Sequence, residues 1–164
     1  MPKLQQSWSE IQNGMKILED LRKKVETFNE GLTSGEFMAK IVREFEPEIC
    51  DMNSENQLYE RGVNNLGVEI MDYMPYTPKT IEIKEIKGQP TDRVTLRDEG
   101  DFHGSFFLQI YADMFEIRAS DEKTEWLMKK YGKQILGLTP DNQAELAREY
   151  IYPELLTKAR QILL

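Results

Sequence analysis

The chain has 164 residues, of which 40% are hydrophobic and 30% charged, and its net charge is −8. This length and composition predict one folded domain over residues 1–164 and exclude a disordered chain. The acidic balance disfavours nucleic acid and anionic membrane surfaces as partners, because binding to either relies on lysine and arginine.

Apolar residues three and four positions apart predict an amphipathic helix over residues 4–28. They are Leu4, Trp8, Ile11, Met15, Leu18, Leu21, Val25 and Phe28. Ser7 and Glu10 are typical of a capping box at its start, and Gly31 is a suitable end. The near-heptad spacing permits a partner helix from another subunit, but packing against the chain's own core is the favoured interpretation.

A second helix is expected from Thr33 or Ser34, interrupted or restarted at Pro47, with a broken helical pattern through Tyr59. Residues 1–60 therefore form the N-terminal helical part of the predicted domain. Residues 61–78 are rich in glycine, asparagine and proline, and this composition favours an irregular connection.

Thr77 and Pro78 predict the start of a short helix that ends at Gly88. This helix carries Lys79, Lys84 and Lys87, so it presents either a basic patch for an acidic neighbouring subunit or an ordinary solvated face.

Two strands are expected over residues 105–113 and 114–120, joined by a tight turn around Asp113. A helix capped by Ser120 or Asp121 and ending at Gly132 follows, and Thr139 with Pro140 begins the last helical part. The predicted fold class is α+β: N-terminal helices, a small antiparallel sheet built around a hairpin, and C-terminal helices over residues 121–164.

The single cysteine, Cys50, excludes an internal disulfide framework, and we expect it to be a small buried hydrophobe rather than a nucleophile paired with His103. The N-terminus lacks the apolar core of a signal peptide, and no run reaches the ~18 apolar residues of a membrane span. We therefore expect a protein that is made and kept inside a cell, or inside a particle assembled there.

Residues 94–106, VTLRDEGDFHGSF, concentrate ligand-capable side chains around Gly100. Asp98, Asp101 and His103 define the metal-binding or acid–base alternative, but their spacing matches no established metal frame. The favoured interpretation is a folded turn. In that turn Asp98 acts as a cap, Gly100 supplies a backbone angle closed to other residues, and His103 lies at the surface or rim. No catalytic, cofactor-binding or metal-ligating residue is predicted.

The order of these motifs resembles the virion-morphogenesis family of bacteriophages, the Mu-type tail-completion or neck proteins. The resemblance spans roughly residues 67–120. It rests on the following positions: Thr77, Pro78, Thr80, Leu96, Asp98, Gly100, Phe102 and Ser105. Glu99 stands where a threonine is usual, and the serine lies one position later than the commonest spacing.

The resemblance implies a non-enzymatic structural protein that needs no cofactor. It would join or complete the head–tail connector as part of a ring, with portal, neighbouring neck or tail proteins and its own copies as partners. Its location would then be the neck or tail region of the virion, after assembly in the host bacterial cytoplasm. Neither sequence-specific nucleic acid binding nor membrane binding is expected.

A ring requires a repeated contact between subunits, and two segments are candidates for it. The first is the irregular stretch from Gly67 to Pro75, because five large side chains in such a segment are hard to bury within one small subunit. These are Val68, Ile70, Met71, Tyr73 and Met74. The second is the long N-terminal helix.

Overall fold

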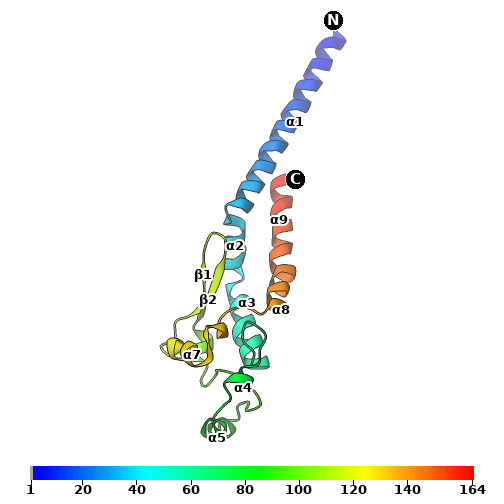
Figure 1. Ribbon diagram of the computed structural model, residues 1–164. Helices are drawn as coiled ribbons and strands as arrows, with labels where there is room; N and C mark the ends of the chain where they lie inside the picture. Colours follow the sequence, from blue (N-terminus) through cyan, green and yellow to red (C-terminus); the bar gives the residue numbers. More distant parts are fainter. Residues whose placement is uncertain (1) are drawn as a thin grey trace.

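A computed structural model describes the backbone of residues 2–164 and the side chains from residue 8 onward. It confirms the α+β fold class: helices at both ends of the chain flank a two-stranded antiparallel sheet (Figure 1). In chain order the elements are α1 (Pro2–Thr33), α2 (Glu36–Glu44), α3 (Glu46–Asp51), the π-helical η1 (Met52–Arg61), α4 (Ile70–Tyr73), α5 (Pro78–Ile86), α6 (Asp101–Gly104), β1 (Phe106–Ile110), β2 (Phe115–Ala119), α7 (Thr124–Tyr131), the 3₁₀ turn η2 (Lys133–Ile135), α8 (Pro140–Glu145), the π-helical η3 (Leu146–Ile151) and α9 (Tyr152–Leu163).

The first helix is longer at both ends than the sequence pattern predicted. It begins at Pro2, so the expected start at a capping box of Ser7 and Glu10 is wrong; the side chains of Leu4 and Ser7 lie outside those described. It also continues through Gly31 to Thr33. Gly31 is needed for another reason, because a β-carbon there would lie 2.2 Å from the ring of Phe37.

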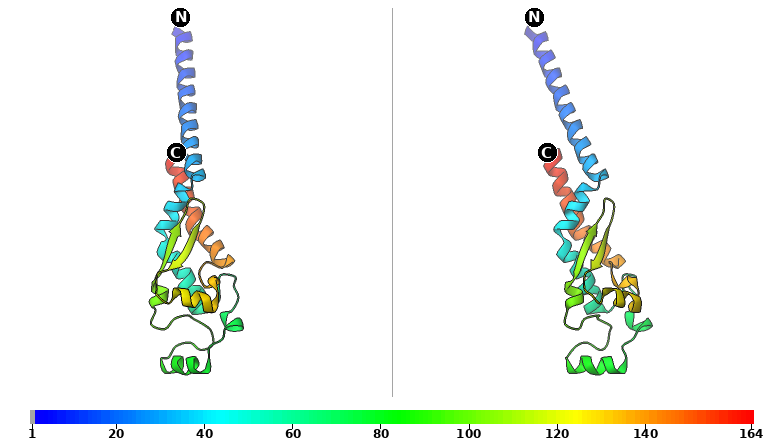
Figure 2. Two further views of the ribbon diagram at one scale, coloured as in Figure 1. Left: turned by 60° about the vertical axis from the view of Figure 1, so that its left-hand side comes forward. Right: turned by 90° about the vertical axis from the view of Figure 1, so that its left-hand side faces the viewer.

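The N-terminal half of α1 stands clear of the rest of the molecule (Figures 1 and 2). Only its C-terminal part lies beside α9, which runs antiparallel to it and ends well before the tip of α1. A helix of 32 residues is about 48 Å long at 1.5 Å per residue, so α1 reaches far beyond the body of its own chain.

The core consists of two adjoining clusters of apolar side chains. The first joins α2, α3, η1, the hairpin and η3, and its buried members are Val42, Ile49, Cys50, Met52, Leu108, Ile117, Leu138 and Leu146. The second joins η1, α4, the extended segment around Val94, α6 and α7, and its buried members are Leu58, Ile70, Val94, Phe102, Leu127, Tyr131 and Ile135. Phe106 and Leu136 contact both clusters and so connect them.

A buried polar network fixes the loop after η2 against η1. The Asn53 side chain donates to the Ile135 carbonyl and accepts from the Gly137 amide. Gln57 donates to the Gly137 carbonyl and accepts from the Thr139 amide at 2.7 Å and from the Asn142 side chain at 2.9 Å. Buried amides of this kind are tolerated only when they are paired, so this network determines where the C-terminal helices leave the core.

The hairpin has the predicted antiparallel pairing, with Leu108 opposite Ile117, and each strand is shorter than expected. The outer edge of β1 is covered, since the Leu108 amide donates to the carboxylate of Glu46 on α3. Among the described residues, no strand pairs with the outer edge of β2. An uncovered strand edge is a surface that proteins normally pair, shorten or shield.

Candidate functional site

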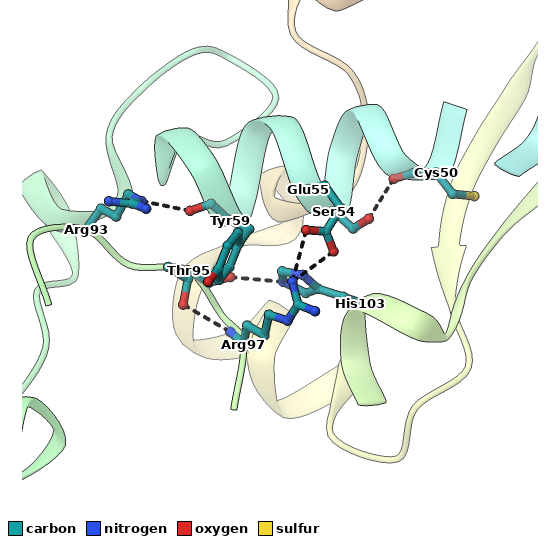
Figure 3. A network of polar contacts seen from close by, with 8 residues as sticks. All are labelled: Cys50, Ser54, Glu55, Tyr59, Arg93, Thr95, Arg97 and His103. Atoms are coloured by element: carbon teal, nitrogen blue, oxygen red, sulfur yellow. Dashed lines mark hydrogen bonds and ion pairs between the residues drawn. The ribbon is translucent and has the colours of Figure 1, made fainter. Parts of the chain in front are cut away.

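The stretch 94–106 is a folded turn that rests on η1 and leads into the hairpin (Figure 3). Arg97 donates to both carboxylate oxygens of Glu55 at 3.0 and 2.9 Å, and its guanidinium lies 4.7 Å from the ring centroid of Tyr59. The Thr95 amide donates to the hydroxyl of Tyr76 at 2.9 Å. These contacts hold residues 95–97 against the core.

His103 lies inside the protein, so its predicted position at the surface or rim is wrong. Its side chain is 6% exposed, and Nε2 donates to the Thr95 carbonyl at 2.9 Å. Because a carbonyl only accepts, the neutral ring carries its hydrogen on Nε2, and the buried Nδ1 has no hydrogen-bond partner. Burial, together with the charges of Arg97 and Lys84, lowers the pKa of His103 to about 4.

Asp98 and Asp101 do not join His103. Asp98 is exposed and forms an ion pair with Lys87, whose ammonium donates to it and lowers the pKa of the carboxyl. It does not cap α6 as predicted, because the residue before that helix is Gly100 and no side chain caps it. Asp101 lies exposed in the first turn of α6. In the part of the chain that the structure describes, no three His, Cys, Asp or Glu side chains stand close enough to hold a metal ion.

Cys50 is buried, as predicted. Burial, reinforced by the carboxylates of Glu46 and Asp51, raises the pKa of its thiol to about 12. The thiol is therefore protonated at neutral pH, and a protonated thiol is a poor nucleophile. His103 is committed to Thr95 and does not activate it.

The first half of the family-like motif forms the helix start that the sequence predicted. The Thr77 hydroxyl accepts the amide of Thr80 at 3.2 Å, and Pro78 occupies the first turn of α5. In the second half, Phe102 is buried and stacks edge-on against Phe106 at 4.9 Å. Leu96 packs against the same cluster, and the Ser105 hydroxyl donates to the Phe102 carbonyl at 2.8 Å. Each of these residues therefore has a local structural role.

The lysines of α5 do not form one basic face. Lys84 is buried, donates to the Gln89 side chain and the Arg97 carbonyl, and lies over the ring of Tyr76. Lys87 is paired with Asp98. Lys79 is exposed. The basic patch that the sequence allowed is smaller in the structure, because Lys84 is buried and holds the turn at Arg97.

Gly100 has φ = 105°, a conformation that side-chain-bearing residues rarely adopt, as the sequence predicted. Gly100→Val is therefore expected to lower the free energy of unfolding by about 1 kcal/mol or more. Gly104→Ala is the matched control, because a β-carbon at that position meets nothing within 4 Å. Denaturant unfolding of both variants provides the measurement. Equal stability of Gly100→Val and the wild type would show that the turn has another conformation.

The candidate interface at residues 67–75 is only partly exposed. Ile70 is fully buried, so its placement in a subunit interface is wrong. Met71 and Met74 are partly buried against the second cluster, so one subunit covers part of each side chain. Val68 and Tyr73 remain 43% and 42% exposed, and a subunit contact there stays a prediction.

The apolar stripe of α1 is exposed to solvent, against the favoured expectation that it packs on the chain's own core. Trp8, Met15 and Leu18 are 65%, 65% and 66% exposed. Ile11, Leu21 and Val25 on the same stripe are also exposed. Large apolar patches of this kind mark interaction surfaces more often than chance exposure.

A groove of 1220 Å³ lies along β2, on the side away from α3. Its apolar walls come from α2, β2, α7 and η3, and they include Met38, Val42, Phe115, Ile117, Met128 and Leu146. Its charged side chains balance, with Asp113 and Glu116 against Arg118 and Lys133. Sequence reasoning did not predict this groove, because its walls come from four elements distant in the chain.

Comparisons with known protein families, with curated proteins and with solved structures find no match to this chain. Among the described residues, no helix combines the length and the apolar character that crossing a membrane requires.

Proposed function

We propose that this chain is a non-enzymatic structural protein of a tailed bacteriophage, which joins or completes the head–tail connector as one subunit of a ring. Its partners are then the portal, neighbouring neck or tail proteins, and its own copies. The exposed apolar stripe of α1 is the observation that carries the proposal. A helix that projects from the body with an uncovered row of tryptophan, methionine and leucine is suited to a larger assembly.

The turn at residues 94–106 supports the same proposal. Several of its polar side chains are bonded within the chain: His103 to Thr95, Arg97 to Glu55 and Asp98 to Lys87. The motif order that resembles the phage family therefore corresponds to a capped helix and a hairpin, and its residues hold the fold. A structural protein needs such residues to maintain its fold, because it functions through contacts between its surface and other subunits.

Deletion of the gene from the phage that carries it tests the proposal. We expect filled heads and separate tails in electron micrographs of the lysate, with infectivity restored by the wild-type gene in trans. Infectious, fully joined particles without the gene would contradict the proposal.

Complementation with Val68→Asp tests the exposed part of the segment 67–75. Val68 is 43% exposed, so this variant should fold. It should restore few joined particles, because a buried charge destabilises the contact once in every subunit of the ring. Ile86→Asp is the control, because Ile86 is 80% exposed on α5 and outside both candidate segments. Full complementation by both variants would exclude Val68 from the contact.

A further inference from the structure

We propose that the exposed stripe of α1 packs into the groove along β2 of a second copy of this chain. This inference rests on the proposed function, and it names two surfaces that form a repeated contact in addition to any contact at residues 67–75. The contact is heterologous, because a convex helix of one copy meets a concave groove of another. Each copy offers one of each surface.

The groove has room for a segment of helix. Its volume is 1220 Å³. Eleven helical residues form a cylinder about 16 Å long and about 10 Å wide, which occupies roughly 1,300 Å³. The exposed stripe from Trp8 to Leu18 comprises eleven residues, so the volume of this segment is similar to that of the groove.

The area of this contact is smaller than that of a stable dimer. Five large apolar side chains of the stripe are exposed from Trp8 to Leu21, and burial of about 100 Å² for each gives on the order of 500 Å². A specific interface buries about 800 Å² per partner, so we expect one isolated contact to be weak and to form at high protein concentration or within a ring.

The charges permit the contact. Glu10 and Glu19 flank the stripe on its two sides, at the spacing of an α-helix. Within the groove the Arg118 guanidinium donates to Glu116, and Lys133 balances Asp113, so no excess of negative charge repels the acidic flanks. A helix in the groove also shields the uncovered edge of β2.

The N-terminal half of α1 does not reach the groove of its own chain. That half points away from the body (Figures 1 and 2), and only Leu32 and Thr33 at the C-terminal end of α1 line the groove. Gly35 forms the junction of α1 and α2 with φ = 74°, and a β-carbon there would lie 1.8 Å from the Ala112 carbonyl oxygen. The hairpin tip therefore packs directly on the junction, which leaves the first half of α1 for another copy.

A contact between two copies of α1 is the competing arrangement. The heptad of Trp8, Ile11, Met15 and Leu18 next requires an apolar residue at position 22, where the chain has Arg22. Val25 returns to the same heptad, so the apolar seam is interrupted at this one position. The crosslinking experiment below therefore distinguishes a contact between two α1 helices from docking of α1 into the groove.

Disulfide formation between two populations of the purified full chain tests the proposal. One population carries Met15→Cys on the stripe, and the other carries Met128→Cys in the groove; the native Cys50 is buried in both. Under mild oxidation at the highest soluble concentration, we expect crosslinked dimers that contain one chain of each kind. Asn13→Cys, on the opposite face of α1, is the control and should yield few crosslinks to Met128→Cys.

Leu18→Asp in the Met15→Cys chain should reduce the crosslink about tenfold or more, because it places a charge in the apolar contact. Asn13→Asp in the same chain should leave it unchanged. Crosslinks of Met15→Cys chains to one another, or no crosslink between the two populations, would overturn the proposal. Mixed crosslinks in a protein that is absent from phage particles would retain the docking and contradict the proposed function.

Discussion

Gln57→Ala is expected to lower the free energy of unfolding by about 3–5 kcal/mol, the largest loss that we predict for a single substitution. The side chain is fully buried and makes three hydrogen bonds to residues 137–142. Its removal leaves a cavity and strands the Gly137 carbonyl and the Thr139 amide without partners. A folded domain has only about 5–15 kcal/mol of stability, so this variant should unfold near physiological temperature.

Urea denaturation at neutral pH measures the effect. Gln143→Ala is the matched control, because its exposed side chain makes one hydrogen bond to the neighbouring Leu138 carbonyl. We expect its loss to stay below about 1 kcal/mol. A Gln57→Ala variant with the stability of this control would mean that the network does not hold the C-terminal helices.

His103 is expected to make stability depend on pH between about 6.5 and 4. The pKa of this side chain is lowered from 6.5 in the unfolded chain to about 4 in the fold. Between these values the unfolded chain binds a proton that the folded chain does not, so stability is fully present above pH 6.5 and falls as the pH falls to about 4. The shift corresponds to about 3 kcal/mol at most.

The difference in unfolding free energy between the wild type and His103→Gln isolates this effect, since the carboxyl groups titrate in both. We expect the difference to shift against the wild type as the pH falls from 7 to 4. His103 was expected at the surface or rim, where its replacement would have had little effect on stability. Because it is buried, His103→Ala should cost more than about 1 kcal/mol at pH 7. A pH-independent difference between wild type and His103→Gln would show that the ring is accessible to solvent in the folded protein.

Local signals in the sequence predicted the fold where a short motif decides the structure. Thr77 with Pro78 and Thr139 with Pro140 do begin helices, because the capping hydroxyl and the proline act within one turn. The predicted cap of the next helix at Ser120 or Asp121 is wrong, because the residue before α7 is Lys123 and no side chain caps this helix. The Asp121 carboxylate accepts the Lys123 amide in the turn before α7, and the helix begins later, at Thr124.

Burial that depends on distant contacts was not predictable in the same way. His103 lies among acidic neighbours in the sequence, and only the packing of Phe102 and Phe106 carries it inside. The stripe of α1 was visible as a pattern, but the pattern is the same whether the helix packs on its own core or on another chain. The candidate interface failed for Ile70 because α4 folds back onto η1 and α7.

Cryo-electron microscopy of purified phage particles tests the central claim most directly. We predict density for this chain in many copies around the axis of the head–tail junction, with α1 of each copy against the hairpin of its neighbour. Mass spectrometry of the same particles should identify the chain among the virion proteins. Particles with a complete, ordered neck that contains no copy of this chain would contradict the account.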